Sequence, residues 1–233
     1  MRILAIDTSG MAASAAVMND DNLIGEWFIH HKKTHSQTLM PIIDQLLKAV
    51  ELHPADIDLF AVSIGPGSFT GLRIGTAVIK GMAQALDKPV IGVPTLDGLA
   101  YNLPLYQGII CPIIDARRNN VYTSIYRFEE SALVRQEDYL ILEVDKLLEI
   151  VNAQKGTPVF LGDGVLKYRD YIIKGVEGRA DFAPGNLLLQ RASSIAMAAL
   201  ERVKRDGPQT FAELTPMYLR PSQAEREYKR CKR

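Results

Sequence analysis

The sequence predicts an α/β protein of two lobes, each with a mixed sheet flanked by helices. Short apolar stretches of strand length alternate with longer stretches of helical periodicity along the 233 residues. An apolar strand, an aspartate, a turn of about five residues and a second strand occur over residues 3–18 and again over 109–128. Such an internal repeat indicates two copies of one topology.

The first half of the sequence predicts secondary-structure elements in the order β-β-β-α-β-α-β-α. The predicted strands cover residues 1–6, 12–18, 22–30, 59–64 and 89–93, and the predicted helices 39–50, 72–86 and 95–101. The helix at 39–50 has the clearest pattern, because its apolar side chains recur every three or four residues along one face.

The second half predicts strands at 109–114, 121–128 and 158–161 and helices at 140–151 and 186–204. We therefore expect a first lobe over 1–104 and a second over 105–220, with packing of the last helix against the first lobe left open. Residues 221–233 are predicted to form a disordered basic tail, since six basic residues stand against two acidic ones from Arg220 onward. The alternative for this tail is loose contact with RNA phosphate.

Composition narrows the class of protein. Lys+Arg and Asp+Glu number 27 each, which argues against a surface built mainly for nucleic acid or an anionic membrane. No window has the roughly 18 apolar residues of a membrane span, and the N-terminus does not have the pattern of a signal peptide. Two cysteines predict no disulfide framework. We expect a cytoplasmic protein.

A glycine-rich turn follows the predicted strand 59–64 and opens the helix 72–86. A strand, glycine turn and helix start direct backbone N–H groups at one point, where anions bind readily. However, Gly71 is followed by Leu72 and Arg73, where a P-loop has Lys and Ser/Thr. Thr70 stands where a dinucleotide fingerprint has its third glycine, so neither motif is present.

Small residues mark two faces of the 72–86 helix. Gly71 and Gly75 lie four apart on one face, and Ala77, Gly81 and Ala85 lie four apart on another. Interior glycines weaken a helix, so close approach of a second backbone is the expected reason for them. That backbone belongs either to the chain's own sheet or to another helix, including one of a partner.

Candidate ligand-binding residues follow the first predicted strand. Asp7, Thr8 and Ser9 form either a phosphate or metal site or an Asx turn, in which Asp7 bonds its own backbone. His31 and His35 have the spacing of two ligands on one helix face, but no Cys, Asp or Glu nearby completes a metal site. We expect no bound metal.

Several motifs together resemble one family. They are Ile-Leu-Ala-Ile-Asp-Thr-Ser at 3–9, His-Ser-Gln at 35–37, Gly-Pro-Gly-Ser-Phe-Thr-Gly-Leu-Arg-Ile-Gly at 65–75, Gly-Val-Pro-Thr-Leu-Asp-Gly-Leu-Ala at 92–100, Ile-Asp-Ala-Arg-Arg at 114–118, Gly-Asp-Gly at 162–164 and Pro-Met-Tyr-Leu-Arg at 216–220. In this order and over nearly the whole chain, they resemble the bacterial TsaB (YeaZ) family.

This resemblance implies the actin-like ATPase (ASKHA, ribonuclease H-like) fold and a role in tRNA modification. A TsaB-like chain would be a non-catalytic subunit that pairs with and activates TsaD and works with TsaE. The complex would transfer a threonylcarbamoyl group to N6 of the adenosine next to the anticodon, in tRNAs that read codons beginning with A. Alone, the chain would form a homodimer, and it would meet tRNA only through the complex.

The resemblance also implies a partner interface and a missing metal site. Pairing would use the helices 39–50 and 72–86, with contacts from Leu39, Ile42, Gly71, Leu72, Gly75, Thr76 and Ile79. In TsaD, the segment comparable to 92–94 leads into a metal-binding His-x-x-x-His. Residues 95–100 contain no histidine here, which implies a non-catalytic paralogue.

Two enzymatic alternatives remain. One is a weak ATPase or kinase-like enzyme that uses Asp7 and Asp115, with ATP or ADP bound in the cleft or at the partner interface. The other is a glycoprotease-like peptidase, which is disfavoured because the sequence offers neither a recognisable nucleophile–base pair nor a zinc site.

Overall fold

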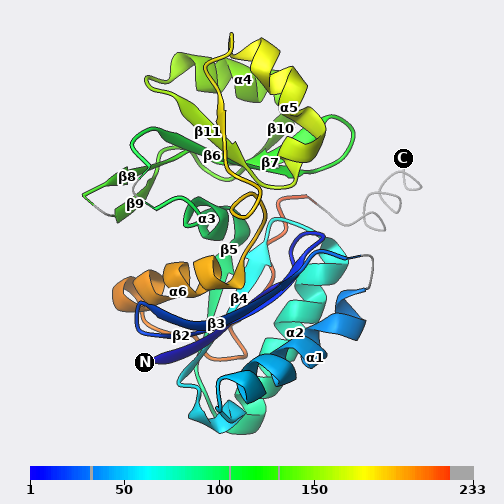
Figure 1. Cartoon of the computed structure of the whole chain (residues 1–233), viewed down its shortest axis with the longest axis vertical. Coiled ribbons are helices and arrows are strands. Elements are labelled where there is room, and N and C mark those ends of the chain that lie inside the picture. The colour runs from blue at the N-terminus through cyan, green and yellow to red at the C-terminus, as the bar shows by residue number, and fades with distance from the viewer. Residues whose placement is uncertain (32–33, 105, 131, 221–233) are drawn as a thin grey trace.

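The computed structural model describes residues 1–31, 34–104, 106–130 and 132–220. Two sheets lie one above the other along the long axis (Figure 1). The first sheet has the strand order β3-β2-β1-β4-β5, and the second has β10-β7-β6-β11-β12 with β8 and β9 attached beside β6. In both sheets the middle strand pairs antiparallel on one side and parallel on the other. The predicted duplication is confirmed.

The first lobe contains a five-stranded sheet and three α-helices. Its elements are β1 (Arg2–Asp7), β2 (Ala13–Asn19), β3 (Asn22–Ile29), α1 (His35–Ala49), the 3₁₀ turn η1 (Pro54–Asp56), β4 (Leu59–Gly65), α2 (Phe69–Leu86), β5 (Val90–Pro94) and α3 (Thr95–Ala100).

The second lobe repeats the pattern with extra strands. Its elements are β6 (Ile109–Asp115), β7 (Asn120–Thr123), β8 (Tyr126–Glu129), β9 (Ala132–Arg135), β10 (Leu140–Glu143), α4 (Val144–Ala153), β11 (Pro158–Leu161), α5 (Gly164–Gly175) and β12 (Asp181–Phe182), followed by α6 (Ala192–Asp206).

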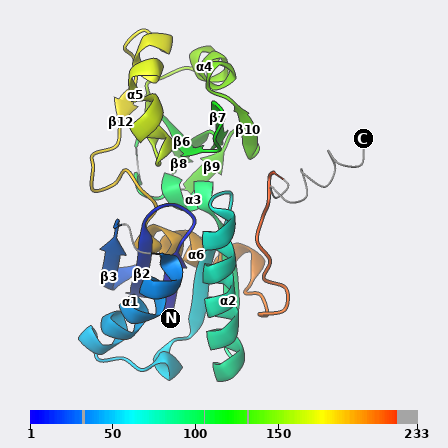
Figure 2. The same cartoon turned by 90° about the vertical axis from the view of Figure 1, so that its right-hand side faces the viewer.

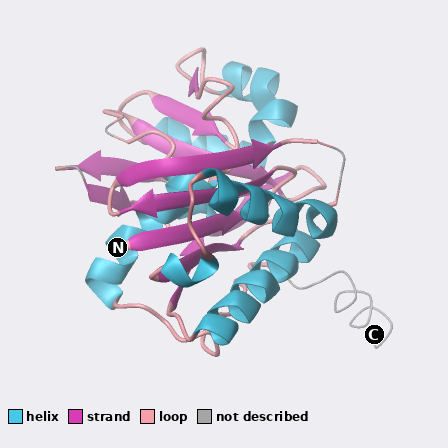
Figure 3. Cartoon of the chain, turned by 60° about the horizontal axis from the view of Figure 1, so that its bottom comes forward, coloured by secondary structure: helices cyan, strands magenta, loops and turns pink. Residues whose placement is uncertain are grey.

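Each lobe packs against one helix that the other half of the chain supplies. Helices α1 and α2 cover one face of the first sheet, and α6, although late in the sequence, covers the other (Figure 2). Helix α3 follows the first sheet, yet its Leu96 and Leu99 pack into the second lobe against Ile110 and Tyr126. Figure 3 shows the resulting layers, with helices against the sheet faces. Each lobe therefore depends on apolar side chains supplied by the other half of the chain.

The helix starts and ends follow local chemistry. The side chain of Ser68 caps α2 by accepting a hydrogen bond from the N–H of Gly71, and Asp87 closes this helix in the left-handed conformation, with φ of 51°. Helix α1 begins at His35, earlier than the predicted start at residue 39, and contains Pro41. Pro41 is exposed, so its missing N–H disturbs no packed face.

Three predictions in the second half are wrong. Residues 140–143 form the edge strand β10 before α4, residues 121–128 divide into β7 and β8, and residues 186–191 lie outside α6. Helix α5 was not predicted. Strands of four residues leave too short a pattern to separate from a helix by periodicity, and tertiary pairing decides them.

The chain ends in a C-terminal strap, residues 207–220, which crosses from the first lobe to the second. Gln209 pairs with Val90 of β5 through two backbone hydrogen bonds, of 2.9 and 2.8 Å. The backbone N–H of Met217 donates to the carbonyl oxygen of Ile64 at 2.7 Å. Nη1 of Arg220 donates to the carbonyl oxygen of Ala116 at 3.0 Å. The predicted basic tail, 221–233, lies outside the described residues.

Candidate functional site

The two lobes face each other at the ends of β1 and β6, where each strand closes with an aspartate. Oδ1 of Asp7 accepts hydrogen bonds from the backbone N–H and the hydroxyl of Ser9, both at 2.8 Å. Oδ1 of Asp115 accepts one from the backbone N–H of Arg117 at 2.9 Å. Both arrangements are Asx turns. The repeat therefore extends from topology to hydrogen bonding.

A glycine turn packs against each of these strand ends. Gly65 and Gly162 have φ of 118° and 97°, conformations that side chains disfavour. A Cβ added to Gly67 would overlap the carbonyl oxygen of Ser9, and one added to Gly162 would overlap that of Ile113. Glycine is required because the backbone of each turn touches the neighbouring strand directly.

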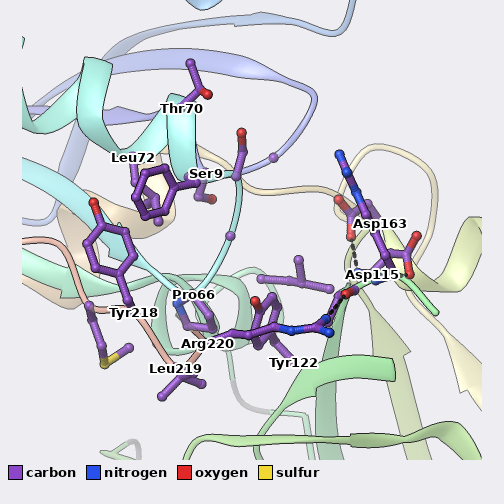
Figure 4. Close-up of a pocket in the computed structure, with 18 of the residues that line it drawn as sticks. Ser9, Pro66, Thr70, Leu72, Asp115, Tyr122, Asp163, Tyr218, Leu219 and Arg220 are labelled. Atoms are coloured by element: carbon purple, nitrogen blue, oxygen red, sulfur yellow. Dashed lines mark hydrogen bonds between the residues drawn. The ribbon is translucent and has the colours of Figure 1, made fainter. Parts of the chain in front are cut away.

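Between these turns lies a cleft of about 810 Å³ (Figure 4). The first lobe lines it with residues 9–11 and 66–70, and the second lobe with residues 114–118, Tyr122 and Asp163. Residues 217–220 of the C-terminal strap form a third wall. The cleft therefore brings both copies of the repeat together at one place.

Of the three residues considered as a phosphate or metal site, Asp7, Thr8 and Ser9, only Ser9 lines this cleft. Asp7 is 1% exposed and turns into its own Asx turn, and burial raises the pKa of its carboxyl group. Thr8 is fully buried, and its hydroxyl donates to the carbonyl oxygen of Gly71 at 2.8 Å. The Asx-turn alternative describes the geometry of this segment, and neither Asp7 nor Thr8 lines the cleft.

The carboxylates of the cleft are already engaged. Nζ of Lys167 lies 3.2 Å from Oδ1 of Asp115. Asp163 accepts a hydrogen bond from the backbone N–H of Asp115 at 3.0 Å. Burial raises the pKa of Asp163, and the negative charge of Asp115 raises it further. At least one carboxylate oxygen of each aspartate is therefore already engaged within the chain.

The seven residues predicted for the partner interface are buried within this chain. They are Leu39, Ile42, Gly71, Leu72, Gly75, Thr76 and Ile79. Periodicity identified the face of each helix that packs on the first sheet, because that face carries the apolar stripe. Gly71 and Gly75 admit Thr8 rather than a foreign helix. Their assignment as direct partner contacts stays a prediction, and in this chain they pack internally.

The second small-residue face of α2 is exposed. Ala77, Gly81 and Ala85 lie on the surface, and a Cβ added to Gly81 would meet no atom within 4 Å. Helix α1 runs beside α2 and exposes Met40, of which 49% is accessible. We call the exposed side of these two helices the outer helix face.

The segment that the resemblance compares with a metal site holds a different network. Asp97 in α3 accepts hydrogen bonds from the hydroxyl of Tyr126 at 2.7 Å and from that of Tyr139 at 2.8 and 2.9 Å. Burial raises the pKa of Asp97 despite these bonds. No group of three or more His, Cys, Asp or Glu side chains in the described residues is placed to hold a metal ion.

Ser9 and His35, which could act as nucleophile and base in a peptidase, form hydrogen bonds with other groups. The hydroxyl of Ser9 donates to Asp7 rather than to a histidine. Nε2 of His35 bonds the carbonyl oxygen of Gly10 at 2.9 Å. Within the described part of the chain, these residues form no hydrogen-bonded nucleophile–base pair of the kind that such catalysis uses.

Comparison with known proteins places the chain in a family. The family model described as "TsaD: tRNA N6-adenosine threonylcarbamoyltransferase" matches residues 29–228. The Bacillus subtilis (strain 168) "tRNA threonylcarbamoyladenosine biosynthesis protein TsaB" is 33% identical over 230 residues, which are 98% of each chain. The chain belongs to the TsaB family. The structure titled "YeaZ from Pseudomonas aeruginosa" covers 94% of this TsaB-family chain and 99% of its own, with 25% identity and a TM-score of 0.77.

More distant structures share the fold alone. An activator of 2-hydroxyisocaproyl-CoA dehydratase from Clostridium difficile, solved with bound ADPNP, has a TM-score of 0.51 at 11% identity and covers 99% of this chain and 98% of its own. The predicted actin-like ATPase fold is confirmed. In the described part of this TsaB-family chain, no helix has both the length and the apolar content needed to cross a membrane.

Several residues that line the cleft were not among the site residues predicted from the sequence. Arg117 and Arg118 line it from the turn between β6 and β7, and Tyr218 and Arg220 line it from the C-terminal strap. Both pairs belong to motifs that carried the TsaB resemblance, at 114–118 and 216–220. The signal was present, but nothing in the sequence brings residues about 100 positions apart to one wall.

Proposed function

We propose that this chain is the non-catalytic subunit that pairs with TsaD and, together with TsaE, enables formation of threonylcarbamoyladenosine in tRNA. The modified base would be the adenosine next to the anticodon, in tRNAs that read codons beginning with A. The chain's relatives carry the name of this pathway, and the matching family model describes the transferase itself. Because the substrate of the proposed complex is tRNA, we expect the chain to be cytoplasmic.

The observation that carries the proposal is the outer helix face. Ala77, Gly81 and Ala85 form a smooth strip along α2, and described residues of this chain leave it uncovered. Small residues four apart let a second helix approach closely, and Met40 adds an adaptable apolar contact on α1. We assign pairing with TsaD to this face, and homodimer formation to the same face when the chain is alone.

The non-catalytic role is supported by the segment at 95–100. Asp97 offers a carboxylate there, but two tyrosine hydroxyls already bond it. Leu96, Leu99 and Ala100 supply no ligand atoms and pack into the second lobe. Catalysis would then reside in TsaD, with this chain acting as its activating partner.

The test is reconstitution of tRNA threonylcarbamoylation with purified TsaD and TsaE, with and without this chain. We expect modification to require the chain, and light scattering to detect a complex of this chain with TsaD. Modification at full rate without the chain would contradict the proposal. So would ATP or peptide turnover by the chain alone with no binding to TsaD, which would favour the enzymatic alternatives.

A further inference from the structure

The turn between β6 and β7 has an unusual backbone. Arg117, Arg118 and Asn119 all lie in the left-handed region, with φ of 63°, 53° and 62°. Residues other than glycine disfavour this region, although asparagine tolerates it. The turn is closed by hydrogen bonds from Ala116 N–H to the Asn120 carbonyl oxygen and from Asn120 N–H to that of Arg117. The fold therefore holds two arginines where glycines would be easier.

The turn brings both arginine side chains to the cleft. Arg117 and Arg118 are exposed, and both line the cleft wall. Within the described residues, neither guanidinium group has a hydrogen-bond or ion-pair partner. Two cationic groups therefore face the same space without a neutralising carboxylate from the described chain.

A third arginine reaches this wall from the other end of the chain. Arg220 donates to the carbonyl oxygen of Ala116, directly before the arginine turn (Figure 4). The C-terminal strap is held there because the ring of Tyr218 stacks on Phe69 at 4.6 Å and its hydroxyl accepts a hydrogen bond from Nε of Arg73 at 3.1 Å. Arg220 is thus positioned by contacts with both lobes.

The cleft is cationic although the chain as a whole is neutral. Three arginines line it against two aspartates, and Lys167 neutralises one of these, Asp115. The opposite wall is the start of α2, residues 68–70, whose helix dipole also favours negative charge. The net charge of the whole chain is zero, but the electrostatic potential in the cleft is set by the charged groups that line it.

Guanidinium groups match phosphate, since they donate paired hydrogen bonds in a planar fork. A mononucleotide and an RNA strand both offer phosphate. The structure favours the strand, because Asp7 is turned away from the cleft and Asp115 is paired, while the arginines are exposed rather than enclosed.

We propose that Arg117, Arg118 and Arg220 contact the phosphate backbone of RNA. This inference rests on the proposed function, in which the RNA is the tRNA substrate. It gives this chain a direct part in substrate binding, beyond the indirect contact expected from the sequence.

The test compares the full chain with the variant R117N/R118N. Asparagine removes the charge and tolerates the left-handed backbone, so the turn keeps its shape. The control K146N/K174N removes two exposed charges from α4 and α5, far from the cleft. Binding of tRNA is measured by fluorescence anisotropy between 50 and 200 mM salt, for each chain alone and in its complex with TsaD.

We expect R117N/R118N to weaken tRNA binding at least about tenfold and to lower the slope of log K against log salt by about two. The control should match the wild type, and R117K/R118K should restore most of the binding. An unchanged slope and affinity for R117N/R118N, with an intact thermal transition, would overturn the inference. So would ATP binding that depends on these arginines while tRNA does not bind.

The modification assay separates the two proposals. If R117N/R118N raises the KM for tRNA and leaves kcat unchanged, both stand. If the complex needs this chain but KM does not respond to the variant, the proposed function stands and the inference fails. If modification does not need the chain at all, the proposed function fails, and the anisotropy of the chain alone still decides whether the arginines bind RNA.

Discussion

Thr8 and Gly71 hold the first strand against the start of α2. The hydroxyl of Thr8 donates a hydrogen bond to the carbonyl oxygen of Gly71 at 2.8 Å, and the carbonyl oxygen of Thr8 fills the space that a side chain at residue 71 would need. Gly75 lies one turn further, where an added Cβ would stand 2.5 Å from the same hydroxyl. One face of the glycine-rich helix is therefore explained by the chain's own fold.

The first prediction concerns these glycines. Gly75→Leu should lower the free energy of unfolding by about 1–3 kcal/mol or more, because it forces side-chain atoms against Thr8. Gly81→Ala, on the exposed face of the same helix, should raise it by up to about 1 kcal/mol. Urea denaturation checks both. If Gly75→Leu and Gly81→Ala changed the free energy of unfolding equally, the contrast between a tightly packed face and an open face of α2 would be refuted.

The second prediction tests the outer helix face. Gly81→Leu should leave the chain folded, since the added side chain enters open space, but it should abolish pairing with TsaD by blocking close helix approach. Light scattering of the mixture measures the complex. Ala153→Leu, an exposed position at the end of α4, is the matched control and should pair normally. If Gly81→Leu bound TsaD as well as the wild type does, the outer helix face would not be the interface.

The third prediction concerns pH. Burial raises the pKa of Asp7 above its ordinary value, so its contribution to stability is greatest below about pH 4 and is lost as pH rises through the raised pKa. Asp7→Asn keeps an oxygen to accept the bonds from Ser9 and cannot ionise. Its stability relative to wild type should increase as pH rises from 4 to 7, measured by urea unfolding. A difference that does not change with pH would refute this assignment.

The fourth prediction concerns the network between the lobes. Tyr126→Phe and Tyr139→Phe each remove one hydroxyl that donates to half-buried Asp97, and each should lower stability by about 1–3 kcal/mol. Their effects should not add, because both phenols serve one carboxylate. Thermal unfolding of the single and double variants measures the coupling. The control Tyr171→Phe alters an exposed pair with Asp145 and should leave the transition unchanged.

The sequence predicted most elements of the first lobe because its strands and helices are long and regularly patterned. The stripe through Leu39 and Ile42 located α1, and the apolar stretch before Gly65 located β4. In the second lobe, β7 to β10 have four residues each, too few for a reliable period, and β10 was therefore predicted as helix.

The candidate site was harder to predict than the fold. The motifs at 114–118 and 216–220 contain Arg118 and Arg220, but only packing places their side chains on one wall. The resemblance to TsaB proteins implied Leu39 and Ile79 as partner contacts, but in this chain both side chains are buried, which a sequence pattern does not report.

By itself, the sequence determined the duplicated α/β topology, the glycine turns and the family, because these depend on local pattern and on order along the chain. The tertiary structure alone decided which helix face is buried, which aspartates are occupied and which arginines share a cleft. The physical reason is that burial and electrostatic pairing arise between segments far apart in sequence. Thr8 against Gly71 and Arg220 against Ala116 are contacts of that kind.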